Sequence, residues 1–94
     1  MFTVTKRAAR FYKKEMELEN GEAIRLFVRY GGKAGKNGFS VGVERSGKLD
    51  RHCDQTIIDG ITFFADPDDR WFLDTVTLDA DENLEDVVLT YAND

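Results

Sequence analysis

Two groups of residues in this sequence could do chemistry. The first is a glycine-rich stretch at residues 31–38, which carries two lysines and follows a segment with two arginines. Glycine-rich backbone can turn its N–H groups inward to bind an anion, and nearby cations add to the attraction. The alternative is a solvated loop whose lysines only keep a hairpin soluble. The residues of this candidate site for a small anion or an acidic partner surface are Arg25, Arg29, Gly31, Gly32, Lys33 and Lys36.

The second group is the neighbouring pair His52 and Cys53, the only imidazole and the only thiol of the chain. Adjacent side chains on an extended segment point to opposite faces, which argues against a cysteine–histidine nucleophile pair. A structural zinc site needs four ligands, so the pair is a candidate metal site only where a homodimer brings two copies together. The alternative is a small buried thiol beside a surface histidine. No triad or carboxylate pair can be singled out, so we predict no catalytic residue, no resident cofactor and no enzyme.

The sequence predicts an N-terminal helix, which must pack on the sheet that carries these candidate site residues. Apolar residues recur at spacings of three and four over residues 6–18, through Ala8, Phe11, Tyr12 and Met16, which predicts an amphipathic helix. Thr5 stands at the N-cap position, and residues 20–21 (NG) are predicted to end the helix, because both types tolerate the left-handed conformation.

Alternating apolar residues then predict a series of short strands. The basic residues fall on a strand at 23–30, and the glycine-rich stretch joins it to a partner at 39–43. An Asp-Gly pair at 59–60 is a strong hairpin signal. The remaining segments that read as strands or a strand-like entry are 2–4, 56–58, 61–65, 75–80 and 87–91, with a turn at 46–48.

A second, very short helix is predicted near residues 67–73. Asp66 is a capping residue, and Pro67 suits the first helical position. Trp71 follows beside Phe72 and Leu73, so we expect Trp71 to be a core residue. The fold class is α+β: a single domain over residues 1–94, with an N-terminal helix packed on a mostly antiparallel pseudo-barrel or sandwich.

Charge is distributed very unevenly along the chain. Residues 1–52 hold twelve Lys and Arg against six acids, whereas residues 53–94 hold Arg70 against twelve acids. The net charge of −5 argues against nucleic-acid binding, which depends on neutralising phosphates.

The acids at 79–86 lack the glycine and glutamate of a calcium loop and are interpreted as a solvated turn. No apolar run is long enough for a membrane span or a secretion signal, so we expect a cytoplasmic protein.

Several short motifs occur in an order that resembles the HesB/IscA-like iron–sulfur cluster biosynthesis family, which includes A-type carriers. The motifs are 25–32 (RLFVRYGG), 39–41 (FSV), 59–60 (DG), 71–74 (WFLD) and 77–79 (TLD), and the resemblance extends over residues 8–91. It implies a compact β-rich pseudo-barrel or sandwich with a packed N-terminal helix.

The same resemblance implies three cysteine ligands for an iron–sulfur cluster, one in the first glycine loop and two on a tail after the last strand. The loop position is Lys33 here, the chain given stops at Asp94 where the tail would begin, and Cys53 matches none of the three. Clusters are held chiefly by thiolates, and a protonated lysine has no lone pair to donate. The chain therefore looks like a cysteine-poor branch.

Two functions follow as hypotheses from these observations. The first is a non-catalytic HesB-like protein linked to iron–sulfur cluster assembly or iron handling through protein contacts, with iron–sulfur assembly proteins as its partners and no cluster at the family site. The second is a binding module for a small anion or an acidic partner that uses residues 31–38. Neither involves nucleic acid or a membrane, and a homodimer stays open.

Overall fold

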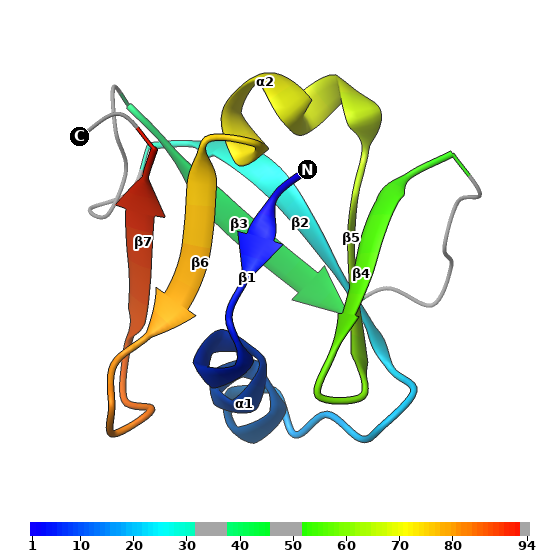
Figure 1. The fold of residues 1–94 in the computed structure, drawn as a ribbon, viewed down its shortest axis with the longest axis vertical. Helices are drawn as coiled ribbons and strands as arrows, with labels where there is room; N and C mark the ends of the chain where they lie inside the picture. Colours follow the sequence, from blue (N-terminus) through cyan, green and yellow to red (C-terminus); the bar gives the residue numbers. More distant parts are fainter. Residues whose placement is uncertain (32–37, 46–51, 93–94) are drawn as a thin grey trace.

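A computed structural model describes residues 1–31, 38–45 and 52–92 (Figure 1). The described chain forms a three-stranded sheet in the order β1-β6-β7 and a four-stranded sheet in the order β3-β2-β5-β4. The fold class is α+β, as predicted. The elements are β1 (Thr3–Val4), α1 (Lys6–Glu15), β2 (Ala23–Tyr30), β3 (Phe39–Arg45), β4 (Asp54–Ile58), β5 (Ile61–Ala65), η1 (Pro67–Asp69), α2 (Arg70–Leu73), β6 (Val76–Ala80) and β7 (Val87–Tyr91).

Both sheets are mixed. β2 pairs with β3, β4 with β5, and β6 with β7 as antiparallel neighbours, whereas β1 runs parallel to β6 and β2 runs parallel to β5. The hairpin predicted at residues 59–60 is confirmed, with positive φ angles of 53° at Asp59 and 82° at Gly60. The predicted turn at 46–48 lies outside the described residues.

The core lies where the two sheets and α1 meet (Figure 1). On β2, Ile24 and Leu26 face the core while Arg25 between them faces outward, which is the period of two that the sequence predicts. Phe63 of β5 is fully buried beside them, and Ala8 and Phe11 of α1 cover the same core. Among the described residues, no helix is long and apolar enough to cross a membrane.

The end of α1 differs from the prediction. The helix ends at Glu15 rather than near residue 18, and the left-handed residue that closes it is Glu17, with a φ of 52°; Gly21 of the Asn-Gly pair also has a positive φ, 96°, but lies beyond the helix end. The N–H of Leu18 donates to the carbonyl of Lys13 at 2.9 Å, which is the closing bond of a Schellman motif. Leu18 is buried. The apolar contact that it gains by turning inward explains why the helix stops early.

The position of Trp71 was also predicted wrongly. Its side chain is 59% exposed, whereas Phe72 and Leu73 are buried. The predicted helix start is confirmed, because the Asp66 carboxylate accepts the N–H of Asp68 at 2.9 Å. However, α2 spans only one turn, and successive side chains of a helix point about 100° apart. One turn therefore cannot direct three consecutive large side chains into the core.

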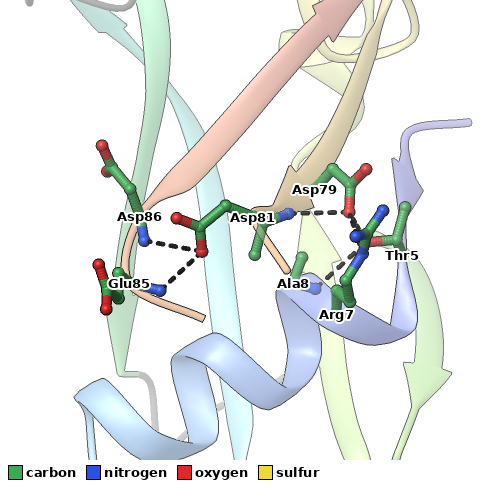
Figure 2. A network of polar contacts seen from close by, with 8 residues as sticks. Thr5, Arg7, Ala8, Asp79, Asp81, Glu85 and Asp86 are labelled. Atoms are coloured by element: carbon green, nitrogen blue, oxygen red, sulfur yellow. Dashed lines mark hydrogen bonds and ion pairs between the residues drawn. The ribbon is translucent and has the colours of Figure 1, made fainter. Parts of the chain in front are cut away.

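A polar network fixes the start of α1 against β6 (Figure 2). Thr5 caps the helix by accepting the N–H of Ala8 at 3.1 Å, and its hydroxyl donates to the Asp79 carboxylate at 2.6 Å. Arg7 lies 3.7 Å from the same carboxylate oxygen. The Thr5 hydroxyl and the donating N–H of Ala80 lower the pKa of Asp79 below its usual value.

In the turn that follows, Asp81 closes the β6–β7 connection with its own side chain. One carboxylate oxygen accepts the N–H of Glu85 at 2.7 Å and that of Asp86 at 3.4 Å (Figure 2). The N–H of Asp81 donates to the Asp86 carbonyl at 3.1 Å. Hydrogen bonds within the turn thus account for this acidic side chain.

Asp79→Asn is expected to lower the free energy of unfolding at pH 7 by about 1 kcal/mol, because it weakens the charge-assisted bond from Thr5. A carboxylate with a lowered native pKa stabilises the fold above its unfolded pKa, and that contribution is lost as the pH falls through the native pKa. The difference between the wild type and the variant should therefore shrink below about pH 4. Urea unfolding at several pH values measures it.

Glu82→Gln is the matched control, because it removes an exposed acid of the β6–β7 turn, three residues after Asp79 in the sequence. It should leave both the stability at pH 7 and its pH dependence nearly unchanged. A constant difference between wild type and Asp79→Asn from pH 7 to pH 2 would contradict the role given to the Asp79 charge.

Candidate functional site

The base of the glycine-rich stretch is fixed by hydrogen bonds between β2 and β3. Gly31 and Gly38 have positive φ angles of 93° and 85°, and the N–H of Gly31 donates to the Gly38 carbonyl at 2.5 Å. The Ser40 hydroxyl donates to the Gly31 carbonyl at 3.0 Å. Three residues of the predicted site, Gly32, Lys33 and Lys36, lie outside the described residues.

The two arginines of the predicted site lie on the outer face of β2 at different positions. They are four residues apart on one strand, so their Cα atoms are separated by about 13 Å. Arg25 donates to Glu44 at 2.8 Å, and its guanidinium lies 5.1 Å from the ring centre of Phe27. Arg29 is exposed beside the loop base and forms no ion pair with another described residue. The anion site stays a prediction.

Aromatic rings from four elements form a continuous row at this end of the molecule, and we call it the aromatic row. Ring centres are 5.5 Å apart between Tyr30 and Phe39, 5.1 Å between Phe39 and Trp71, and 5.7 Å between Trp71 and Phe72. Phe72 is also 6.0 Å from Tyr91. Such edge-to-face and tilted contacts stabilise aromatic pairs beyond simple burial.

Part of the aromatic row is buried and part is open to solvent. Phe72 is 7% exposed, whereas Trp71 is 59% and Tyr30 is 82% exposed. The rings of Tyr30 and Trp71 stand at 77° and 87° to the half-buried ring of Phe39. The exposed rings of Tyr30 and Trp71 therefore flank the ring of Phe39, which lies between them.

Met1 adds a further apolar side chain at α2. Its ammonium group lies 3.3 Å from the Asp74 carboxylate, at the end of α2, and its side chain is exposed. Tyr30, Trp71 and Met1 are three of the five exposed large hydrophobic residues of the described chain; the others, Ile57 and Val88, lie on β4 and β7. Clustering of this kind marks interaction surfaces more often than scattered exposure does.

The sequence did not indicate the aromatic row as a site. Tyr30 belongs to the alternate residues of β2 that face the core, and it directly precedes a glycine. It therefore lies where the strand leaves the core. Phe39 follows the loop in register with Tyr30. Two features of the sequence could have indicated the row. They are the pairing of Tyr30 with Phe39 in the expected hairpin and the three large residues at 71–73 in one predicted helical turn.

Cys53 lies far from this end of the molecule. Asp54 pairs with Ala65 across β4 and β5, and Ala65 pairs with Leu26 across β5 and β2. Strand spacing and rise then place Cys53 about 10 Å across the sheet from β2 and about 13 Å along it from Gly31. In Figure 1 the start of β4 is at the upper right and the end of β2 is at the upper left.

His52 is exposed and Cys53 half-buried, and both make contacts within the chain. In residues 1–31, 38–45 and 52–92, no group of three or more His, Cys, Asp or Glu side chains is arranged to hold a metal ion. The metal site suggested for a homodimer stays a prediction.

Comparison with known proteins identifies the family. The model of a family described as iron-sulphur cluster biosynthesis matches residues 1–94. The chain belongs to that family. The resemblance to the HesB/IscA group is therefore confirmed. One relative, named pyruvate dehydrogenase inhibitor, from Bacillus subtilis (strain 168), is 34% identical over 93 residues, which are 98% of this chain and 87% of the relative.

The described residues at the base of the glycine-rich stretch include no cysteine, the usual ligand of an iron–sulfur cluster. The resemblance implies that the first ligand follows Gly32, a position outside the described residues, and the nearest described residues in the sequence are Tyr30 and Gly31 before it and Gly38 and Phe39 after it. Glycine backbone and aromatic rings supply no thiolate, which is the usual ligand of such clusters. The only thiol of this iron–sulphur cluster biosynthesis family member lies on another part of the sheet.

Trp71→Ala is expected to lower the free energy of unfolding by less than about 1 kcal/mol, as is usual for exposed positions. Phe72→Ala should cost about 3–5 kcal/mol, because it leaves a cavity in the core. Urea unfolding of both variants measures the difference. The native protein should also show the fluorescence of a water-exposed indole, since Trp71 is its only tryptophan. Equal costs for the two substitutions would contradict the surface position.

Proposed function

We propose that this chain is a non-catalytic member of its family, one that acts by binding a partner protein and carries no cluster at the family site. The observation that carries the proposal is the composition of the described residues beside the loop, where Tyr30 and Trp71 are exposed aromatic rings and no thiolate is present. Trp and Tyr are the side chains most enriched among residues that dominate protein–protein binding energies. The proposal also takes the two sheets and α1 as the family's pseudo-barrel.

The separation of Cys53 from the loop supports the same proposal. A cluster ligand must place its sulfur within bonding distance of iron, and a thiol more than about 10 Å away on a hydrogen-bonded sheet cannot reach it. Lysine at position 33 supplies a cation instead of a ligand. The chain has kept the family's strand pattern while its site has a different chemistry.

The relative suggests the class of partner. Its name states that it inhibits a pyruvate dehydrogenase, and its similarity extends over nearly the whole of this chain. A small chain that inhibits an enzyme by binding to it needs a contact surface and no catalytic centre, which agrees with the exposed rings. We therefore take a pyruvate dehydrogenase as the proposed partner, and iron–sulfur assembly proteins, which the family suggests, as the alternative.

Anaerobic reconstitution with iron and sulfide should leave the desalted protein colourless, with far less than one iron per chain. The physical reason is the shortage of thiolates, since one cysteine is available per chain. Iron and sulfide determination with an absorption spectrum provides the measurement. Stoichiometric cluster that is retained by the wild type and lost in Cys53→Ala would instead support a site shared between two copies.

Addition of the purified chain to a purified pyruvate dehydrogenase complex from its own organism should reduce NADH formation in a saturable manner. The heat-unfolded chain and an unrelated acidic domain of similar size are the controls, and neither should inhibit. Unchanged activity together with direct binding to a purified iron–sulfur scaffold protein would favour the alternative partner class.

A further inference from the structure

The exposed part of the aromatic row is not required by the core. Phe72 already fills the buried position, and Tyr30 touches the rest of the row only through Phe39. Tyr30 and Trp71 remain mostly exposed to water and bury only part of their area on folding, so their contribution to stability is small. Tyr30, Phe39 and Trp71 instead form an open three-ring surface with two nearly perpendicular sides.

The charge on the α2 side of this surface is negative, whereas Lys33 and Lys36, in the stretch that joins Tyr30 to Phe39, lie outside the described residues. The segment from Asp66 to Asp74 carries four aspartates and one arginine. Arg70 is already engaged, because its Nε and Nη2 donate to the two carboxylate oxygens of Asp54 at 2.7 and 2.6 Å. A bidentate pair of this kind holds the guanidinium in one orientation. The only cation of the segment is therefore directed away from further partners.

Trp71 has carboxylates on both sides along its helical segment. Asp68 and Asp74 lie three residues before and three residues after it, the spacing at which side chains share a helix face, and both are exposed. The ammonium group of Met1 is the described cation that lies near Asp74, at 3.3 Å.

The cation nearest to Tyr30 along the strand faces the other way. Arg29 directly precedes Tyr30 on β2, and successive side chains of a strand point to opposite faces. Its charge therefore lies on the outer face of the sheet, while the rings lie on the inner face. At this end of the sheet, the outer face therefore carries the positive charge of Arg29 and the inner face carries the aromatic rings.

We propose that Tyr30, Phe39 and Trp71 form the docking surface for a basic segment of the partner protein, with an arginine side chain lying against the rings. A guanidinium group is attracted to an aromatic face, and its planar shape allows it to stack there while it pairs with a carboxylate. The exposed Asp68 and Asp74 supply that carboxylate charge. This inference rests on the proposed function, because it names the surface through which the chain would bind.

Trp71 makes a direct test possible, because it is the only tryptophan of the chain. The probe is a synthetic nine-residue peptide with three arginines separated by glycines, compared with the same peptide in which glutamates replace the arginines. The arginine peptide should change the Trp71 fluorescence in a saturable manner, and added salt should weaken the binding. No response to the arginine peptide, or a stronger response to the glutamate peptide, would overturn the proposed occupant.

Variants that keep the fluorescent residue locate the binding surface. Tyr30→Ser and the double substitution Asp68→Asn with Asp74→Asn should each weaken peptide binding several-fold. The matched controls are Val88→Ser, which removes an exposed apolar side chain from β7, and Glu82→Gln, which removes an exposed acid from the β6–β7 turn. Equal effects of the site variants and the controls would contradict the assignment, and circular dichroism confirms that each variant is folded.

A second measurement uses the pyruvate dehydrogenase complex and separates the two proposals. Tyr30→Ser and Trp71→Ser should reduce inhibition about tenfold or more, the loss typical of a central aromatic contact, while Val88→Ser inhibits like the wild type. Inhibition by the wild type that both aromatic variants retain would overturn the docking surface and leave the proposed function standing. Absence of inhibition by the wild type would overturn a pyruvate dehydrogenase as the proposed partner, and the peptide titration would then decide the docking surface by itself.

Discussion

Hydrogen bonding along both edges of β2 is the interaction on which the rest of the fold depends. β2 pairs with β3 from Ile24 to Tyr30 on one side and, over its first half, with β5 on the other. This pairing fixes which residues face inward, because a shift by one residue would reverse every side chain. The buried Ile24 and Leu26 hold that register. The same parity then places Tyr30 at the point where the strand runs beyond the core.

Local sequence patterns predicted the strands well because each strand has its own alternation and turn signals. The bounds of β2, β5 and β7 are those predicted, and the Asp59–Gly60 hairpin and the Asp66 cap were predicted from residue types alone. These features depend on neighbours within a few residues. The end of α1 was missed because burial of Leu18, a tertiary contact, decides it.

The site was harder to predict because its members meet only through the tertiary fold. Arg25 was a candidate anion ligand on charge alone, but the register of β2 and β3 brings Glu44 beside it. The aromatic row combines residues from β2, β3, α2 and β7, and no sequence spacing relates Tyr30 to Trp71. Trp71 was assigned to the core because hydrophobicity is visible in the sequence, whereas the direction in which one short turn points it is not. Family membership likewise predicts the fold better than the chemistry of the site.

The closed base of the glycine loop has a consequence for how this family can diversify. The Gly31–Gly38 hydrogen bond and the contact between Tyr30 and Phe39 join the strands before the loop begins. Lengthening a loop whose ends are already held together costs only a fraction of a kcal/mol for each few residues. Added residues between these two glycines are therefore expected to cost little stability. Evolution can change the chemistry presented there, from a metal-binding residue to a charged or recognition sequence, without first finding compensating mutations in the core.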